Sequence, residues 1–182
     1  MSRRASLIAV DGVNGRAVVA AASDAGRRHG RAFKGVSRWD ASGLFDQLMV
    51  SADDPPSPRL LLLLYAADLA FRLRWEIEPA LAEGRSVVAA PYIDTAVAFG
   101  RASGLPAKWL QSVFRFARQP SERHLVESPA RALRPAAGFV EFGCQWVSHP
   151  HGPWPRRDLE ARTRAYLRGR KASHARRAVR RR

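Results

Sequence analysis

The residues with the clearest chemical potential form a glycine-containing turn near the N-terminus. Four apolar residues, 7–10, lead into Asp11 and Gly12, and Gly15 opens a run of small residues. A strand that passes through a glycine turn into a helix can hold a nucleotide phosphate, because the first N–H groups of the helix point at the anion. The candidate nucleotide-binding residues are therefore Asp11, Gly12, Asn14, Gly15 and Arg16.

The side chains that would complete such a phosphate cradle are missing from this turn. A working cradle adds a further glycine, a Lys for the β- and γ-phosphates and a Ser or Thr for the metal ion. Ala17, Val18 and Val19 stand at those places. The sequence thus predicts the scaffold of a phosphate-binding loop without the Lys and Ser/Thr side chains that bind phosphate and metal. Only backbone N–H groups are left to bind a nucleotide there.

The rest of the chain alternates short apolar segments with helical patterns. The predicted strands are residues 7–10, 31–36, 86–90 and 138–147. The predicted helices are residues 16–29, 42–49, 59–83, 93–100, 106–118 and 158–170. Strands that alternate with helices predict an α/β protein with a doubly wound, mainly parallel sheet covered on both faces, which makes three layers.

The helix predicted over residues 59–83 has the strongest signals. Pro58 suits a first turn, Gly84 ends the pattern, and Pro79 predicts a kink near Trp75. The helix is apolar nearly all round, so it is buried on several sides or buries one side in a partner chain.

Positive charge is concentrated near the C-terminus. The formal net charge is +15, and residues 156–182 carry 12 Lys or Arg against two acidic residues. Such a segment attracts nucleic acid or another polyanion without sequence specificity, or it only keeps the end of the chain solvated. Beyond Arg170 we expect disorder in isolation. The candidate polyanion-binding residues are Arg176, Arg177, Arg180, Arg181 and Arg182.

Cysteine and histidine offer no convincing site. Cys144 is the single cysteine, and its spacing to His149 and His151 matches no structural zinc pattern. The chain shows no signal peptide or segment long enough to span a bilayer, and the basic end has little apolar face for a membrane surface. We therefore expect no metal site, no membrane association and a cytoplasmic location.

Several of these segments together resemble the thymidylate kinases, a branch of the P-loop nucleoside monophosphate kinases. Residues 64–69, Leu-Tyr-Ala-Ala-Asp-Leu, resemble the family's Leu-Phe-Ala-x-Asp-Arg motif. The other similar segments are residues 7–20, 37–40, 79–88 and 93–110. The resemblance covers about the first two thirds of the chain. It implies a family-like domain over residues 1–155, followed by a basic helix and tail over residues 156–182.

The resemblance also implies positions for a substrate pocket. Tyr65 stands where the family places a base-stacking Phe, although a tyrosine in an apolar helix is also a natural core residue. Arg38 falls in the family's loop beside the substrate, where it either stacks on a base or packs on Trp39. The substrate-pocket candidates are Arg38, Tyr65, Arg72 and Tyr92.

The departures from the family fall on its charged positions. Val18 replaces the phosphate-binding Lys, and Leu69 replaces the Arg that binds the substrate phosphate. Ala90 and Pro91 replace an Asp-Arg pair. Asn14 replaces an acid that faces the metal, and the Arg-rich lid has no convincing counterpart after Arg118. Loss of these groups together predicts that catalytic residues are absent.

Three functions remain open from the sequence. The first is a thymidylate-kinase-like pseudoenzyme that binds a partner, as a homodimer or with a competent kinase subunit, through residues 59–83. The second is a diverged active kinase that uses ATP and Mg²⁺, with Arg16, Arg72 or Arg74 in new roles. The third is a nucleic-acid-associated factor in which the domain only carries the basic end.

Overall fold

The computed structural model describes residues 5–40, 43, 45, 56–127, 138–147 and 156–179. Within these residues the strands form one parallel sheet with the order β2-β3-β1-β4. The strands are β1 (Leu7–Gly12), β2 (Phe33–Arg38), β3 (Ser86–Ala90) and β4 (Glu122–Val126). Parallel neighbours require crossover connections, and helices supply them. The predicted α/β class is confirmed.

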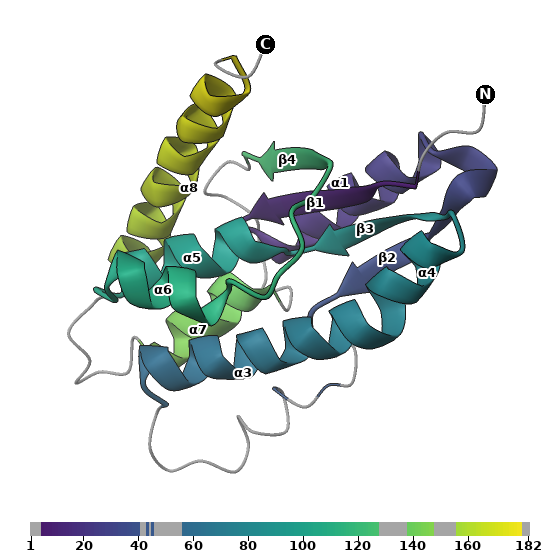
Figure 1. Ribbon diagram of the computed structural model, residues 1–182. Coiled ribbons are helices and arrows are strands. Elements are labelled where there is room, and N and C mark those ends of the chain that lie inside the picture. Colours follow the sequence, from purple (N-terminus) through teal and green to yellow (C-terminus); the bar gives the residue numbers. More distant parts are fainter. Residues whose placement is uncertain are drawn as a thin grey trace.

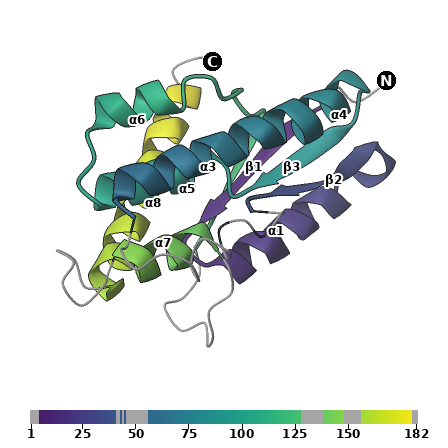
Figure 2. The same cartoon turned by 90° about the horizontal axis from the view of Figure 1, so that it is seen from below.

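The two central strands are buried on both faces, which explains their continuous apolar sequences. Ile8 and Val10 of β1 pack with α1 (Gly15–Arg27) on one face. Leu7 and Ala9 point to the other face, into the larger core formed with α3 (Pro58–Arg72) and α5 (Ile93–Ala102). Figures 1 and 2 show α1 and α3 on opposite sides of the strands. This arrangement gives the three layers expected from the sequence.

The long helix after Ser57 is continuous but irregular. It runs as α3, a π-helical segment η2 (Leu73–Ile77) and α4 (Glu78–Ala82). Proline lacks an N–H group and crowds the carbonyl four residues earlier, which for Pro79 belongs to Trp75. The wider π turn, in which the N–H of Glu78 donates to the carbonyl of Leu73, accommodates this defect. The irregularity predicted near Trp75 therefore takes the form of a π turn.

The prediction of a strand over residues 138–147 is wrong, because these residues form α7 (Phe139–Val147). Glu141 and Gln145 are less buried than the other residues of the segment, all of which lie in the core. A spacing of four between the polar positions places them on one face of a helix. The sequence suggested a strand because apolar and other residues alternate at the start of the segment, and this alternation hid the helical spacing of Glu141 and Gln145.

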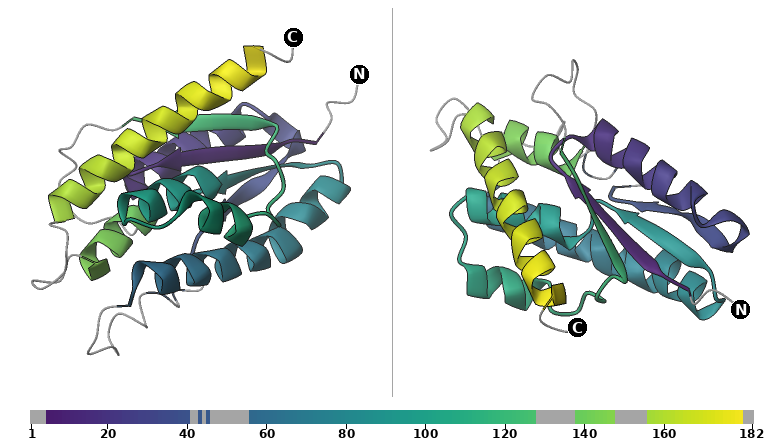
Figure 3. Two further views of the ribbon diagram at one scale, coloured as in Figure 1. Left: turned by 60° about the vertical axis from the view of Figure 1, so that its left-hand side comes forward. Right: turned by 90° about the horizontal axis from the view of Figure 1, so that it is seen from above.

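The basic C-terminal segment is a helix, α8 (Arg156–Val179), that packs along α5 and α7 (Figure 3). Leu159, Thr163 and Leu167 are buried at spacings of four, and they form the inner face of the helix. The prediction of disorder beyond Arg170 is therefore wrong for residues 171–179. Residues 180–182 lie outside the described part of the chain.

Other predicted boundaries shift by a few residues. Strand β2 begins after a short 3-10 turn, η1 (Gly30–Ala32), and α6 (Ala107–Val113) ends earlier than expected. Most of the helix predicted over residues 42–49 lies outside the described residues. Among the helices that the structure describes, none is both long and apolar enough to cross a membrane.

Candidate nucleotide-binding site

Asp11, at the end of β1, anchors the glycine turn to a neighbouring strand connection. Its Oδ1 accepts hydrogen bonds from the N–H groups of Tyr92 (3.0 Å) and Thr95 (2.9 Å). The Thr95 hydroxyl accepts a bond from the N–H of Gly12 at 3.0 Å. Burial, reinforced by the charge of Asp94, raises the pKa of Asp11 from 3.8 to about 6. The carboxylate is therefore a buried structural link that faces backbone rather than a ligand.

The N–H groups at the start of α1 are largely committed within the chain. The Asn14 side chain caps the helix by accepting a bond from the Ala17 N–H at 2.9 Å, and the Asn14 carbonyl accepts one from Val18 at 3.0 Å. The N–H of Gly15 donates to Oε1 of Glu141 at 2.9 Å. These are the donors that a phosphate would use in a working loop. Here Asn14 acts as an ordinary helix cap.

Val18 fills the space beneath the turn. It is buried in the core between the sheet and α1. A Cβ added to Gly12 would lie 2.8 Å from Cγ2 of Val18 and 3.1 Å from the carbonyl oxygen of Val126. Close packing of the turn against this valine thus requires glycine at position 12.

A cavity of about 150 Å³ remains beside the turn. Gly12 and Gly15 line it on one side, and Arg38 and Trp39, at and after the end of β2, line it on another. The remaining lining residues are Val13, Val18, Val19, Ala90, Pro91, Gly138 and Phe139. Arg38 is exposed, and it is the charged residue of this lining.

Tyr65, Arg72 and Tyr92 meet below the cavity, at the connection from β3 to α5. The Tyr65 hydroxyl bonds to the carbonyls of Pro91 (3.0 Å) and Tyr92 (2.5 Å), and Arg72 Nη1 donates to the Pro91 carbonyl at 3.3 Å. Arg72 also donates through Nε to Asp68 at 2.7 Å. All three predicted residues are buried, so the structure places them in the core around residues 91–92.

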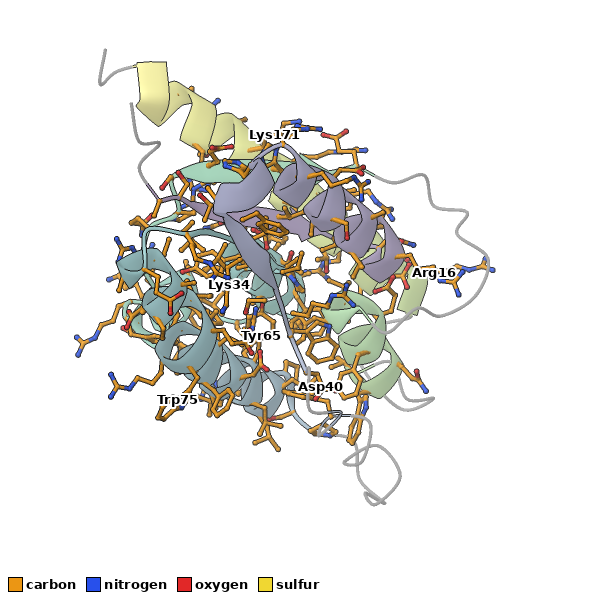
Figure 4. The ribbon with its side chains drawn as sticks, turned by 90° about the vertical axis from the view of Figure 1, so that its right-hand side faces the viewer. Arg16, Lys34, Asp40, Tyr65, Trp75 and Lys171 are labelled. Carbon is orange, nitrogen blue, oxygen red and sulfur yellow. The ribbon has the colours of Figure 1, made fainter. Side chains whose placement is uncertain are left out.

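The side chain of Tyr65 is covered by other rings. Phe139 lies 4.5 Å from it between ring centroids, and Phe114 lies 6.1 Å away. Figure 4 shows Tyr65 among the side chains between α3 and the sheet, whereas Arg16 points outward from α1. A nucleobase would reach the Tyr65 ring only if Phe139 moved. Of the predicted site residues, only Gly12, Gly15 and Arg38 line the same cavity.

The neutral replacements lie where the resemblance places a charged pocket. Ala90 and Pro91 line the cavity, and Leu69 is fully buried in the core. The adjoining segment of residues 128–137, where a lid would follow β4, lies outside the described residues. The substitutions thus leave the described part of the pocket wall apolar apart from Arg38.

Sequence reasoning missed a partly buried ionic cluster that joins α8 to the body of the protein. Asp94 accepts a bond from Arg170 Nε at 2.8 Å and lies 3.3 Å from Arg123 and 3.2 Å from His174. Burial by itself would raise the pKa of Asp94. The positive charges of Arg170, Arg123 and His174 have the larger effect and hold this pKa below its ordinary value. The sequence of the basic segment gave no signal that Arg170 and His174 face Asp94.

The candidate polyanion-binding residues are only partly described. Arg176 is exposed on α8, and Arg177 lies in the same helix. Arg180, Arg181 and Arg182 lie outside the described residues. Cys144 is buried, and His149 and His151 also lie outside that part of the chain. Among the residues described, no group of three or more His, Cys, Asp or Glu side chains has a metal-binding arrangement.

Glu141 and Thr95 are further residues at the turn that sequence reasoning missed. Glu141 was hidden because its segment was assigned to a strand, and only the four-residue spacing to Gln145 pointed to a helix. Trp39, which the sequence suggested only as a neighbour of Arg38, packs edge to face on Phe45, Phe139 and Phe142, so it belongs to an aromatic cluster at the cavity wall.

Together, the parallel sheet, the helix that begins directly after the glycine turn and the adjacent cavity define a P-loop-kinase-like α/β fold. Comparison with known structures agrees with this class. A thymidylate kinase from Ehrlichia chaffeensis superposes with a TM-score of 0.57 and 16% identity, over 68% of this chain and 71% of that one. At this identity the likeness concerns the fold.

Comparison with curated proteins leads to the same family. A probable thymidylate kinase from Caldivirga maquilingensis is 28% identical over 127 residues, which cover 68% of this chain and 62% of that protein. One from Pyrobaculum calidifontis is 25% identical over 131 residues, 70% of this chain and 67% of that protein. A thymidylate kinase from Desulfosudis oleivorans is 44% identical over 80 residues, 42% of this chain and 37% of its own.

A scan against protein-family models found no match. The curated and structural comparisons nevertheless bear out the resemblance: the chain is thymidylate kinase-like in sequence and in fold. The match spans somewhat less than two thirds of the Caldivirga protein.

The buried carboxyl of Asp11 predicts a dependence of stability on pH. Because its pKa is about 6 in the folded protein and 3.8 in its unperturbed form, its stabilising contribution is complete below pH 4 and is lost as pH rises through 6. We expect the free energy of unfolding of the wild type, relative to Asp11→Asn, to fall by on the order of 1–3 kcal/mol between pH 4 and pH 7.

Chemical denaturation at several pH values measures this difference. Asp24→Asn, an exposed change on α1 with the same loss of charge, is the matched control. A difference between wild type and Asp11→Asn that stays flat, or that rises with pH, would contradict the assignment of a buried, preferentially protonated Asp11.

Proposed function

We propose that this protein is a thymidylate-kinase-like pseudoenzyme, a binding or structural protein that keeps the kinase fold and does not transfer phosphate. The observation that carries the proposal is the state of the turn between β1 and α1. The Gly15 N–H is bonded to Glu141, the Ala17 N–H is bonded to Asn14, and Val18 is packed in the core. The site retains its shape without the donors and charges of a kinase.

The size of the missing contributions supports inactivity. Loss of one preorganised donor commonly lowers a rate by about a hundred- to a thousand-fold. Phosphoryl transfer relies on positioning and charge stabilisation, so several losses in one pocket leave little catalysis. Arg38 is the charged side chain left in the cavity wall, and Arg72 is engaged with Asp68 and the Pro91 carbonyl.

The described residues do not fit ATP with Mg²⁺. The Asp11 carboxylate is engaged with two backbone N–H groups. Val18 and Val19 stand where the resemblance implies the phosphate-binding Lys and the metal-binding Ser or Thr. The alternative of a diverged thymidylate or nucleoside monophosphate kinase rests on one observation, the position of Arg38 at the cavity. Arg16 lies outside the cavity lining, on the exposed side of α1.

We expect no turnover when the wild-type protein is incubated with ATP, Mg²⁺ and a panel of nucleoside monophosphates that includes dTMP. Nucleoside diphosphate formation, followed by chromatography, is the measurement. Arg38→Ala removes the basic group of the cavity wall and is the test variant. Arg115→Ala, which removes an exposed arginine on the segment after α6, is the matched control for loss of charge. Turnover by the wild type that Arg38→Ala abolishes and Arg115→Ala preserves would establish the active-kinase alternative.

The proposal includes a partner on the outer face of the long helix. Leu60, Leu63, Phe71 and Trp75 are exposed there, Phe71 by 60% and Trp75 by 64%. Their spacing of three, eight and four residues keeps them on one side of α3 and η2, and Figure 4 shows Trp75 at the surface. Large apolar side chains in such a row mark an interaction surface. We favour a second copy of this chain as its occupant, in a cytoplasmic setting.

Sedimentation of the 20.2 kDa chain tests this surface. We expect a dimer for the wild type at micromolar concentration, and at least a tenfold weaker dimer for Phe71→Glu/Trp75→Glu, because burial of two charges is costly. Phe116→Glu, a change at another exposed aromatic, should leave the dimer intact. A monomeric wild type would contradict the homodimer.

We also propose that the outer face of α8 binds polyanions such as nucleic acid. This face comprises the exposed residues Arg157, Arg168, Lys171 and Arg176, whereas Arg170 and His174 point inward to Asp94. Lys171 and Arg168 lie 3.4 and 4.0 Å from Glu127 in exposed pairs, which hold basic side chains only weakly. Helix α8 thus displays these charges, and it includes Lys171 and Arg176, for which the sequence predicted disorder.

Nucleic-acid affinity measured across salt concentrations tests the outer face of α8. Arg157→Gln/Arg168→Gln/Arg176→Gln should weaken binding and reduce the slope of log K against log salt by about 2–3, because each lost phosphate contact removes about 0.9. Arg28→Gln/Lys34→Gln/Arg115→Gln removes three exposed charges elsewhere and should change the slope much less. Equal effects of the two triple variants would refute a specific role for α8.

A further inference from the structure

Helix α7 brings a carboxylate to the glycine turn from a distant part of the sequence. Oε1 of Glu141 accepts the hydrogen bond from the Gly15 N–H at 2.9 Å, across 126 residues. A carboxylate oxygen at the N-terminus of a helix satisfies the same donor, and the same positive end of the helix dipole, as a phosphate oxygen. An anion is therefore already present at this position, and it is a side chain of the protein.

The backbone of α7 is seated directly on the turn. A Cβ added to Gly138 would lie 2.6 Å from Cα and 2.8 Å from N of Gly15, and it would also collide with Oε2 of Glu141. Such distances leave no room for any side chain at position 138. The approach that delivers Glu141 to Gly15 thus depends on glycine at position 138.

The first turn of α7 also forms one wall of the cavity. Gly138 and Phe139 line it together with Arg38, and Phe139 is buried against Tyr65 and Trp39 at centroid distances of 4.5 and 5.5 Å. These contacts hold the helix backbone in place. Glu141 is half-buried, and its Oε2 is enclosed beside Gly138. Release of the Gly15 N–H therefore requires displacement of the Glu141 side chain from this contact.

We propose that Glu141 is a built-in competitor for the anion position at the start of α1, an autoinhibitory contact that closes the site to phosphate groups. The inference rests on the proposed function, because it explains how a kinase-like loop without its lysine is kept from binding ligand. A phosphate-bearing molecule binds at Gly15 and Arg38 only when the Glu141 carboxylate has moved away.

Binding of pyrophosphate, measured by calorimetry at low salt, tests the proposal. We expect Glu141→Ala to bind pyrophosphate at least about tenfold more tightly than the wild type, because the donor is vacated and a negative charge is removed. Glu141→Gln retains an oxygen acceptor for Gly15 and loses only the charge, so its gain should be about threefold. Glu78→Gln, an exposed change on α4 with the same charge difference, should bind like the wild type.

The source of the phosphate group is resolved by parallel titrations of Glu141→Ala. Inorganic phosphate, dTMP, ATP and a 5′-phosphorylated oligonucleotide all carry the same chemistry, and the tightest of them identifies the ligand class. Arg38→Ala added to Glu141→Ala should remove most of the gain, because it deletes the basic group of the cavity wall. A gain that survives this second change would place the anion elsewhere and overturn the assignment.

A folded Glu141→Ala that binds pyrophosphate no better than wild type overturns the proposal. If Glu141→Ala does not fold, Glu141→Gln decides, and the absence of any gain beyond Glu78→Gln has the same consequence. Turnover assays on the same proteins keep the two ideas separate. Phosphoryl transfer by the wild type refutes the pseudoenzyme but not the competition, whereas a null binding result refutes the competition and leaves the pseudoenzyme standing.

Discussion

The structure depends on the buried carboxylate of Asp11. One of its oxygens accepts N–H bonds from Tyr92 and Thr95, which joins the end of β1 to the start of α5. Burial raises the pKa of this carboxyl, because the ionised form loses its contact with water. The hydrogen bonds from the two backbone N–H groups offset part of that cost. These bonds fix the end of β1, and with it the glycine turn, relative to the start of α5. In this protein the acid at the end of the strand supports the fold.

A second constraint acts on the first turn of α1. Its free N–H groups and the helix dipole create a demand for acceptors that some group must satisfy. Asn14 satisfies one donor from within the turn, and Glu141 satisfies another from α7. Side chains of this protein therefore accept the hydrogen bonds that a nucleotide phosphate accepts in a phosphate-binding loop. Neutral residues at positions 18, 69, 90 and 91 are compatible with this internal solution.

The ionic cluster at Asp94 links α8 to the segment that holds the glycine turn. Arg123, Arg170 and His174 surround one carboxylate that sits at the start of α5, directly before Thr95. Because Thr95 holds Gly12, the docking of α8 and the geometry of the glycine turn share one short segment of α5. The C-terminal helix thus packs against α5, with Arg170 and His174 facing Asp94 and other basic residues on its exposed outer face.

The sequence by itself determined the alternation of strands and helices, the parallel sheet, the irregularity near Trp75 and the glycine turn between β1 and α1, because periodicity, glycine and proline act locally. It could not determine the roles of Tyr65, Arg72 and Tyr92, which are buried around the Pro91 and Tyr92 carbonyls. Nor could it reveal α7 or Glu141, since an aromatic-rich segment fits either a strand or a helix until it is packed. Only tertiary structure brings position 141 to position 15, because the contact arises from long-range packing and not from any local preference.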